Sequence, residues 1–139
     1  MNGELKITRS VERANQLVRR YLTAHLDRLG VSDIEAHLLA RLAAKGPCSV
    51  ADVQKAFGLR ASTLTNALDR LDRRGLLTRR SHPDDRRTFL LSLTGAGREA
   101  AATVVAMVDA VEARVADRVS ASQLDGFHAV LAALEESLE

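Results

Sequence analysis

Apolar residues recur every three or four positions along most of the chain, a spacing typical of amphipathic helices. It breaks between residues 76 and 93, where apolar and polar side chains alternate as they do in half-buried strands. Two strands, 76–80 and 88–93, are expected there, separated by turn-forming residues. The pattern predicts helices over residues 8–29, 50–57, 61–74 and 95–118, with two more between Ser32 and Gly46 and from Ser120 to the C-terminal end.

Polar residues and glycines punctuate this pattern where helices should begin and end. Ser32 with Glu35, and Ser120 with Gln123, have the capping-box form, in which the hydroxyl and the later side chain bond each other's backbone amides. Glycines follow several of the expected helices, at the C′ position where glycine is favoured. These glycines are Gly30, Gly58 and Gly75.

The helices over 50–57 and 61–74 are separated by three residues that begin with Gly58, which is a helix-turn-helix pattern. Ala51 and Val53 are expected in the tight inner packing of this unit, with Leu59 under the turn. The second helix carries one apolar stripe with spacings of three and four residues. Its members are Leu64, Ala67, Leu68 and Leu71.

The other faces of helix 61–74 carry short polar side chains near the start and arginines further along. A recognition helix has this distribution, because its early residues reach base edges and its cations meet phosphates. A solvated surface helix would be patterned in the same way. The candidate DNA-binding residues on this helix are Ser62, Thr63, Thr65, Asn66, Arg70 and Arg73.

The hairpin that follows favours a recognition helix over a solvated surface helix, because a hairpin directly after a recognition helix is the wing of a winged helix. Arg86 and Arg87 lie near its tip and suit a narrow, electronegative minor groove. Asp85 is adjacent and could hold a guanidinium in place through a bidentate pair. The fold class expected is mainly helical with a small β hairpin, built as a winged helix-turn-helix.

Charge is unevenly distributed along the 139 residues. The net charge of +2 divides into +3 over residues 1–57, +4 over 58–87 and −5 over 88–139. A basic centre before an acidic C-terminal end suggests a polyanion-binding segment on a solvated support. All eight cations of the centre are arginines, which fork onto phosphates and guanines, although a GC-rich genome would also favour arginine codons.

Composition excludes several classes of protein. An apolar share of 46% is too high for a mainly disordered chain, and one cysteine, Cys48, cannot form an internal disulfide. The longest nearly apolar run, residues 100–108, is nine residues long, whereas a membrane span needs about 20. Residues 1–6 lack the pattern of a signal peptide. A cytoplasmic protein without membrane contact is expected.

Apolar stripes also run along the C-terminal helices. Val104, Val108, Val111 and Val115 are spaced by four, three and four residues, and the last helix has a similar row from Leu124 to Leu138. A winged helix of about 60 residues needs little additional cover. A symmetric homodimer would bury these stripes and the apolar face of helix 8–29.

In element order and motif spacing, nearly the whole chain resembles the MarR family of bacterial transcriptional regulators. One part of the likeness is the stretch from Ser49 to Leu77, with its helix-turn-helix. The other is an Asp-x-Arg in the wing followed by Leu-Thr-x-x-Gly at the start of the long helix. The matching residues are Asp85, Arg87, Leu93, Thr94 and Gly97.

This resemblance implies a homodimer that binds a pseudo-palindromic DNA operator. Helix 61–74 would enter the major groove, Arg87 would reach the minor groove, and Asp85 would orient a nearby arginine. It also implies a repressor that releases DNA in response to a small phenolic ligand, a metal or an oxidant. The corresponding organisation is a dimerisation helix in residues 1–31, a winged helix-turn-helix in 32–94 and dimerisation helices in 95–139.

Three features bear on the signal that such a regulator would sense. Cys48 lies outside helix 8–29, where peroxide-sensing relatives carry theirs, and is interpreted as a small buried residue. No metal site is expected, because the histidines are scattered. Tyr21 and His25 share the apolar face of helix 8–29, where packing is favoured over a ligand pocket. The four histidines are His25, His37, His82 and His128.

Two other functions compete with DNA binding. The sequence contains no nucleophile elbow, phosphate loop or paired metal motif, so an enzyme is not expected and no cofactor is assigned. A winged helix used only for protein contacts is the alternative. Clustered wing arginines disfavour it, because the centre of a protein interface usually avoids like charges.

Overall fold

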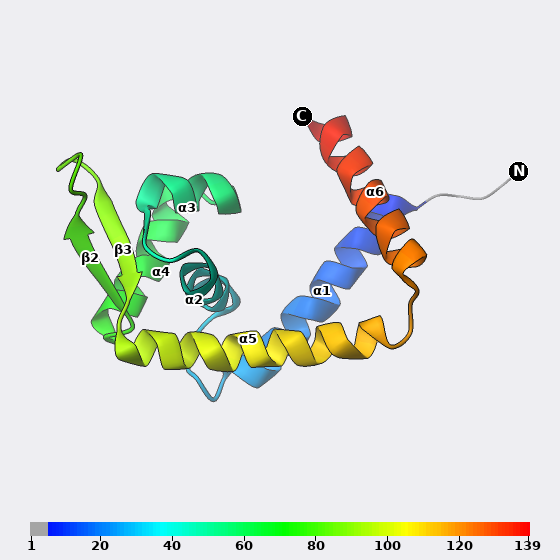
Figure 1. Cartoon of the computed structure of the whole chain (residues 1–139), viewed down its shortest axis with the longest axis horizontal. Coiled ribbons are helices and arrows are strands. Elements are labelled where there is room, and N and C mark those ends of the chain that lie inside the picture. Colours follow the sequence, from blue (N-terminus) through cyan, green and yellow to red (C-terminus); the bar gives the residue numbers. More distant parts are fainter. Residues whose placement is uncertain (1–5) are drawn as a thin grey trace, which may run out of the picture. The chain divides into compact units, whose positions relative to one another are not determined.

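We describe a computed structural model of the chain, which covers residues 6–139 (Figure 1). The signal-peptide prediction rests on residues 1–6, of which 1–5 lie outside the described part. The fold is mainly helical with one small sheet, as the sequence predicts. Its elements are α1 (Ile7–Leu26), α2 (Asp33–Lys45), β1 (Cys48–Ser49), α3 (Val50–Phe57), α4 (Ala61–Arg73), β2 (Leu77–Ser81), β3 (Phe89–Leu93), α5 (Gly95–Ala116) and α6 (Ala121–Leu138).

The sheet has three antiparallel strands rather than the two of a simple hairpin. Strand β3 lies in the centre, with β2 on one side and the two-residue β1 on the other. Cys48 pairs with Leu91, and Ser49 pairs with Leu90. The strand β1 therefore ties the segment between α2 and α3 to the wing.

The chain divides into two compact units, one extending to Val104 and the other running from Val105 to Glu139. The first unit has a core of leucines from α1, α2, α4 and the sheet, which pack away from water. The four residues of the predicted α4 stripe are all buried. The fully buried large side chains are Leu26, Leu38, Leu39, Val53, Leu64, Leu68, Leu71, Leu77 and Leu91.

The second unit contains the end of α5 and all of α6. Helix α6 begins at Ser120, whose hydroxyl accepts a hydrogen bond from the Gln123 amide, while the Gln123 side chain bonds the Ser120 amide. No residue of α6 is buried within the chain. Val104, the first residue of the apolar row predicted along α5, is buried in the first unit. The rest of that row lies in the second unit.

Several predicted details were wrong. Helix α1 ends at Leu26 and not at residue 29, because the amides of Leu29 and Gly30 both turn back to the Leu26 carbonyl. Helix α4 ends one residue earlier than predicted, and helix α5 ends two residues earlier, because helix ends fray. Ala51 lies on the outer face of α3 and is exposed, whereas Val53 is buried.

The start of α5 is fixed against the wing by two residues of the Leu-Thr-x-x-Gly motif. The Thr94 hydroxyl accepts from the Gly97 amide and donates to the Gly75 carbonyl, at 3.0 and 2.6 Å. A Cβ on Gly97 would overlap the Leu76 carbonyl. Glycine is therefore required there, because α5 passes directly against the start of the wing.

Among residues 6–139, no helix combines the length and the apolar content needed to cross a bilayer.

Candidate nucleic-acid interface

The polar face of α4 lies opposite its buried stripe. Ser62, Thr65 and Asn66 are exposed there, and Thr63 is partly buried. The N-cap residue of α4 is Arg60, whose side chain makes no capping hydrogen bond. The amides of the first turn therefore have no side-chain cap at this position, and such amides favour an anion.

A buried carboxylate of α2 binds an arginine in the last turn of α4. The Arg70 Nε donates to Glu35 Oε1 at 2.5 Å, and the Glu35 side chain is only 4% exposed. The second Glu35 oxygen accepts from the Ser32 amide and completes the capping box of α2. Arg70 was predicted to contact DNA, but the structure also gives it a structural partner. Its side chain remains 55% exposed.

The end of α4 is attached to the turn between α1 and α2. The Arg74 guanidinium donates to the carbonyls of Gly30 and Leu29, at 2.5 and 2.6 Å. Arg70 and Arg74 are one helical turn apart, so both reach across from the same side of α4. Arg73 is exposed.

The wing is attached to α4 by one arginine. Arg79 on β2 forms ion pairs with Asp69 and Asp72, two carboxylates of α4. These pairs offset the negative charge of α4 beside the wing. They also fix strand β2 against the helix that carries the polar face.

At the tip of the wing, Asp85 binds Arg87. One carboxylate oxygen accepts from the Arg87 amide at 3.0 Å and from its Nε at 3.2 Å. The predicted bidentate pair is therefore wrong, since a single Asp85 oxygen receives both bonds. The Arg87 side chain is 91% exposed, so Asp85 directs it without covering its outer nitrogens. Arg86 beside it is also exposed.

The wing turn has further internal hydrogen bonds. The Thr88 amide and hydroxyl both donate to the Asp85 carbonyl, and the Asp84 amide contacts His82 Nδ1. Phe89, where β3 begins, is half exposed, so the expected apolar row of this strand is buried only in part. The loop that joins β2 and β3 (Figure 1) is thus held in a defined turn by these hydrogen bonds.

Residues 31–89, which include α2, the helix-turn-helix and most of the wing, match the model of the MarR family. The chain is therefore similar to this family over its helix-turn-helix and most of its wing. Members of this family are transcriptional regulators and not enzymes.

Three further matches agree with this similarity. An uncharacterized HTH-type transcriptional regulator of Bacillus subtilis, YwhA, is 27% identical over 106 residues, which span 76% of each chain. The structure of S. aureus MepR in its DNA-binding conformation superposes with a TM-score of 0.89 at 20% identity, over 97% of this chain and 100% of that one. A MepR–DNA complex gives 0.86 at 20% identity, over 96% and 99%. These structural likenesses show the fold.

The predicted effector residues lie together on α1. The Tyr21 and His25 rings are 4.0 Å apart between centroids, and His25 Nδ1 lies 2.7 Å from the Tyr21 carbonyl oxygen. His25 is exposed and Tyr21 is half-buried. The pair stacks on its own helix, and the four histidines do not converge. Residues 6–139 contain no group of three or more His, Cys, Asp or Glu side chains placed to hold a metal.

Cys48 is half-buried rather than fully buried, between α2 and α3. Burial raises the pKa of its thiol, and Asp52 acts in the same direction, while Arg41 opposes them. The thiol is therefore less ionised at neutral pH than an ordinary cysteine.

Three residues that position this candidate interface were not expected from the sequence. Glu35 was identified only as a capping residue, and Arg74 and Arg79 were counted only as charge. The spacing of Arg70 and Arg74 places both beside the buried stripe of α4, which was the available signal. Their partners are 35 and 44 or 45 residues away along the chain, so local pattern could not identify them.

Proposed function

We propose that this chain is a repressor that binds a pseudo-palindromic DNA operator as a homodimer. One observation carries the proposal. The exposed polar face of α4 and the arginine-tipped wing belong to one unit, and Arg79 fixes them to each other through Asp69 and Asp72.

Each part of this surface has a distinct role in DNA recognition. Thr65 and Asn66 are exposed on the first half of α4, where side chains of a recognition helix reach base edges in the major groove. Ser62 and Thr63, near the N-terminal end of α4, and Arg73, near its C-terminal end, would contact phosphates, as would the outer nitrogens of Arg70. At the wing, Arg87 would enter the minor groove with Asp85 setting its direction and Arg86 beside it.

The homodimer is supported by apolar side chains that the single chain leaves in water. Leu17 and Val18 are about half exposed on α1. In the second unit, the largest such side chain is Phe127, which is 55% exposed. Exposed rows of this kind mark association surfaces. The others in this unit are Val105, Val108, Val115, Val119, Leu124, Val130 and Leu138.

Relief of repression by a small aromatic or phenolic effector is the remaining part of the proposal. It is supported by the family resemblance and by the aromatic surface that Tyr21 and His25 form on α1. A phenolic compound that releases DNA from the wild type but not from Tyr21→Ala would support this location. Equal release from both would place the effector elsewhere.

Selection from a random duplex pool at about 150 mM salt, near physiological screening, tests operator binding. An inverted repeat with half-sites about one helical turn apart is the expected product. Light scattering of the free protein should give twice the chain mass, and Phe127→Glu should reduce that mass. If no duplex is retained at any salt concentration, the chain is instead a winged-helix module for protein contacts. A selected site that overlaps a promoter and blocks transcription in vitro would establish repression.

A further inference from the structure

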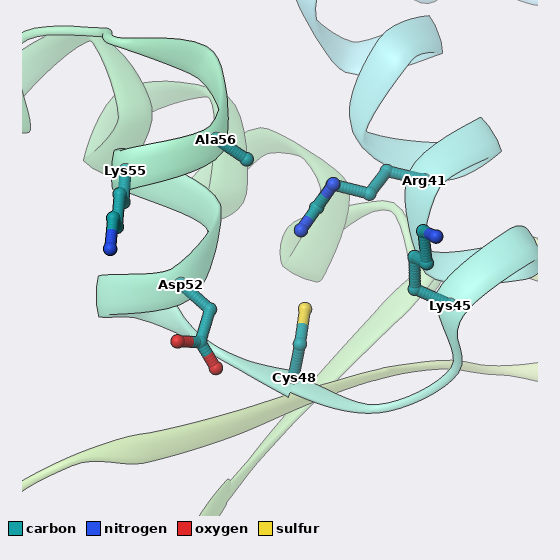
Figure 2. Close-up of a pocket in the computed structure, with 6 residues that line it drawn as sticks. All are labelled: Arg41, Lys45, Cys48, Asp52, Lys55 and Ala56. Carbon is teal, nitrogen blue, oxygen red and sulfur yellow. The ribbon is translucent and has the colours of Figure 1, made fainter.

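A depression of about 460 Å³ opens between α2 and α3 (Figure 2). Helix α2 contributes Arg41 and Lys45, which are one turn apart and therefore on one face. Strand β1 contributes Cys48. Helix α3 contributes Asp52, Lys55 and Ala56.

Positive charge predominates around this depression, because three cations face one carboxylate. None of the four forms an ion pair with another side chain among residues 6–139. The cations therefore remain available to a ligand, and their combined field attracts an anion.

Arg41 carries a donor without a partner. Its Nε is buried from solvent, and no acceptor in the structure bonds it. A buried donor left unpaired costs about 1–3 kcal/mol. In Figure 2 the Arg41 guanidinium, the Cys48 thiol and the Ala56 methyl group point toward a common space. Because the Nε itself is closed to solvent, an oxygen anion in this space would meet the terminal nitrogens of the Arg41 guanidinium.

We propose that this depression is a binding site for a compact organic anion bearing a carboxylate or phosphate group. The guanidinium of Arg41 would receive the anionic group, because its planar fork matches the paired oxygens of such groups. Lys45 and Lys55 would add charge from either side. The apolar part of the ligand would lie against Ala56 and the Cys48 side chain.

The location connects this site to the DNA-binding elements. Strand β1 pairs with β3 of the wing, and α3 is the first helix of the helix-turn-helix. A ligand in the depression would contact β1 and α3 at the same time. The inference does not require the proposed operator binding, because occupancy can be measured in the free protein.

Cys48 provides the readout, since it is the only cysteine of the chain. We would follow its alkylation by N-ethylmaleimide at fixed pH in the full-length protein, adding sodium benzoate or sodium phosphate against sodium chloride of equal ionic strength. Saturable protection is expected. One-site mass action gives about a tenfold slower rate at ten times the dissociation constant. Rates that are equal in all three salts would overturn the proposal.

Two variants and a control test the assignment to these residues. Arg41→Gln removes the anion receptor and should abolish protection. Ala56→Leu keeps every charge but fills the depression, so it should also abolish protection even if Arg41→Gln does not fold. Arg118→Gln removes the same charge from the exposed segment after α5 and should retain protection. Undiminished protection in a folded Arg41→Gln or Ala56→Leu protein would refute the site.

A phosphate of the DNA backbone could also provide the anionic group. A separate measurement with a DNA duplex in place of the free anions distinguishes the two. If a duplex protects Cys48 while neither free anion does so, the depression is a contact for the DNA backbone and the small-anion proposal fails. Protection by free anions without DNA supports it.

Discussion

Arg70 of α4 pairs with Glu35, a carboxylate of α2 that is buried beneath it, at 2.5 Å. The two side chains differ in exposure, because Arg70 is half exposed and Glu35 is buried. Removing Arg70 would leave a buried carboxylate without its cation, whereas removing the Glu35 charge would leave an arginine that water can reach.

We therefore expect Arg70→Gln to lower the free energy of unfolding more than Glu35→Gln does. The expected loss for Arg70→Gln is about 1–3 kcal/mol, the usual cost of a buried polar group without its partner. Glu35→Gln keeps the capping box, since glutamine also bonds the N-cap amide, and so isolates the ion pair. Urea denaturation of the three proteins measures both values. Equal losses would contradict the expected asymmetry, and no loss in either variant would show that the pair contributes nothing to stability.

Gly97 is expected to resist even the smallest substitution. Gly97→Ala places a methyl group on the Leu76 carbonyl and should destabilise the protein by about 1–3 kcal/mol or more, as over-packing does. Gly126→Ala is the matched control, because that position in α6 has no neighbour within 4 Å. There alanine should stabilise the helix by about 0.8–1 kcal/mol. Thermal unfolding should move the two melting temperatures in opposite directions.

The wing contact is expected to contribute both affinity and salt dependence. Arg87→Ala should weaken operator binding by about 1–3 kcal/mol and reduce the slope of log affinity against log salt by about 0.9. Asp85→Asn should cause a smaller loss, because the guanidinium remains but loses its ionic partner. Arg118→Ala serves as the charge control. Titrations of a labelled operator at several salt concentrations measure these effects, and an unchanged affinity for Arg87→Ala would remove this residue from the interface.

Asn66 is expected to determine sequence preference rather than stability. Its side chain is exposed on α4, so Asn66→Ala should leave the unfolding curve unchanged. Loss of a bidentate base contact should reduce discrimination at one base pair of each half-site by about 1–3 kcal/mol. Binding to a panel of single-base operator variants measures this. A uniform loss across the whole panel would instead assign Asn66 to a phosphate.

The reactivity of Cys48 is expected to vary with pH in a defined direction. Because burial raises its pKa, the thiolate fraction at neutral pH lies below that of free cysteine, and alkylation should be slower. The rate should continue to rise above the pH at which an ordinary thiol is fully ionised. Arg41→Gln should move this profile to still higher pH, because Arg41 lowers the pKa. A profile that coincides with free cysteine would contradict the burial of this thiol.

Elements set by neighbouring residues could be predicted from the sequence, because helix periodicity and caps act over a few positions. The buried row of α4 lies where its spacing indicated, and Ser32 and Ser120 cap α2 and α6 as predicted. The Asp85–Arg87 contact was also predictable, since its partners are two residues apart. The exposed polar face of α4 follows from the same periodicity that buries its opposite side.

The sequence by itself thus determined the order of elements, the helix-turn-helix with its wing, and the side chains on the outer face of α4. Only the tertiary structure decided what holds that face in place. Arg70 forms an ion pair with Glu35, and Arg79 forms one with Asp69. The absence of a side chain at Gly97 leaves room for the Leu76 carbonyl. The physical reason is that these contacts join residues from different elements, and their geometry exists only after the intervening chain has folded.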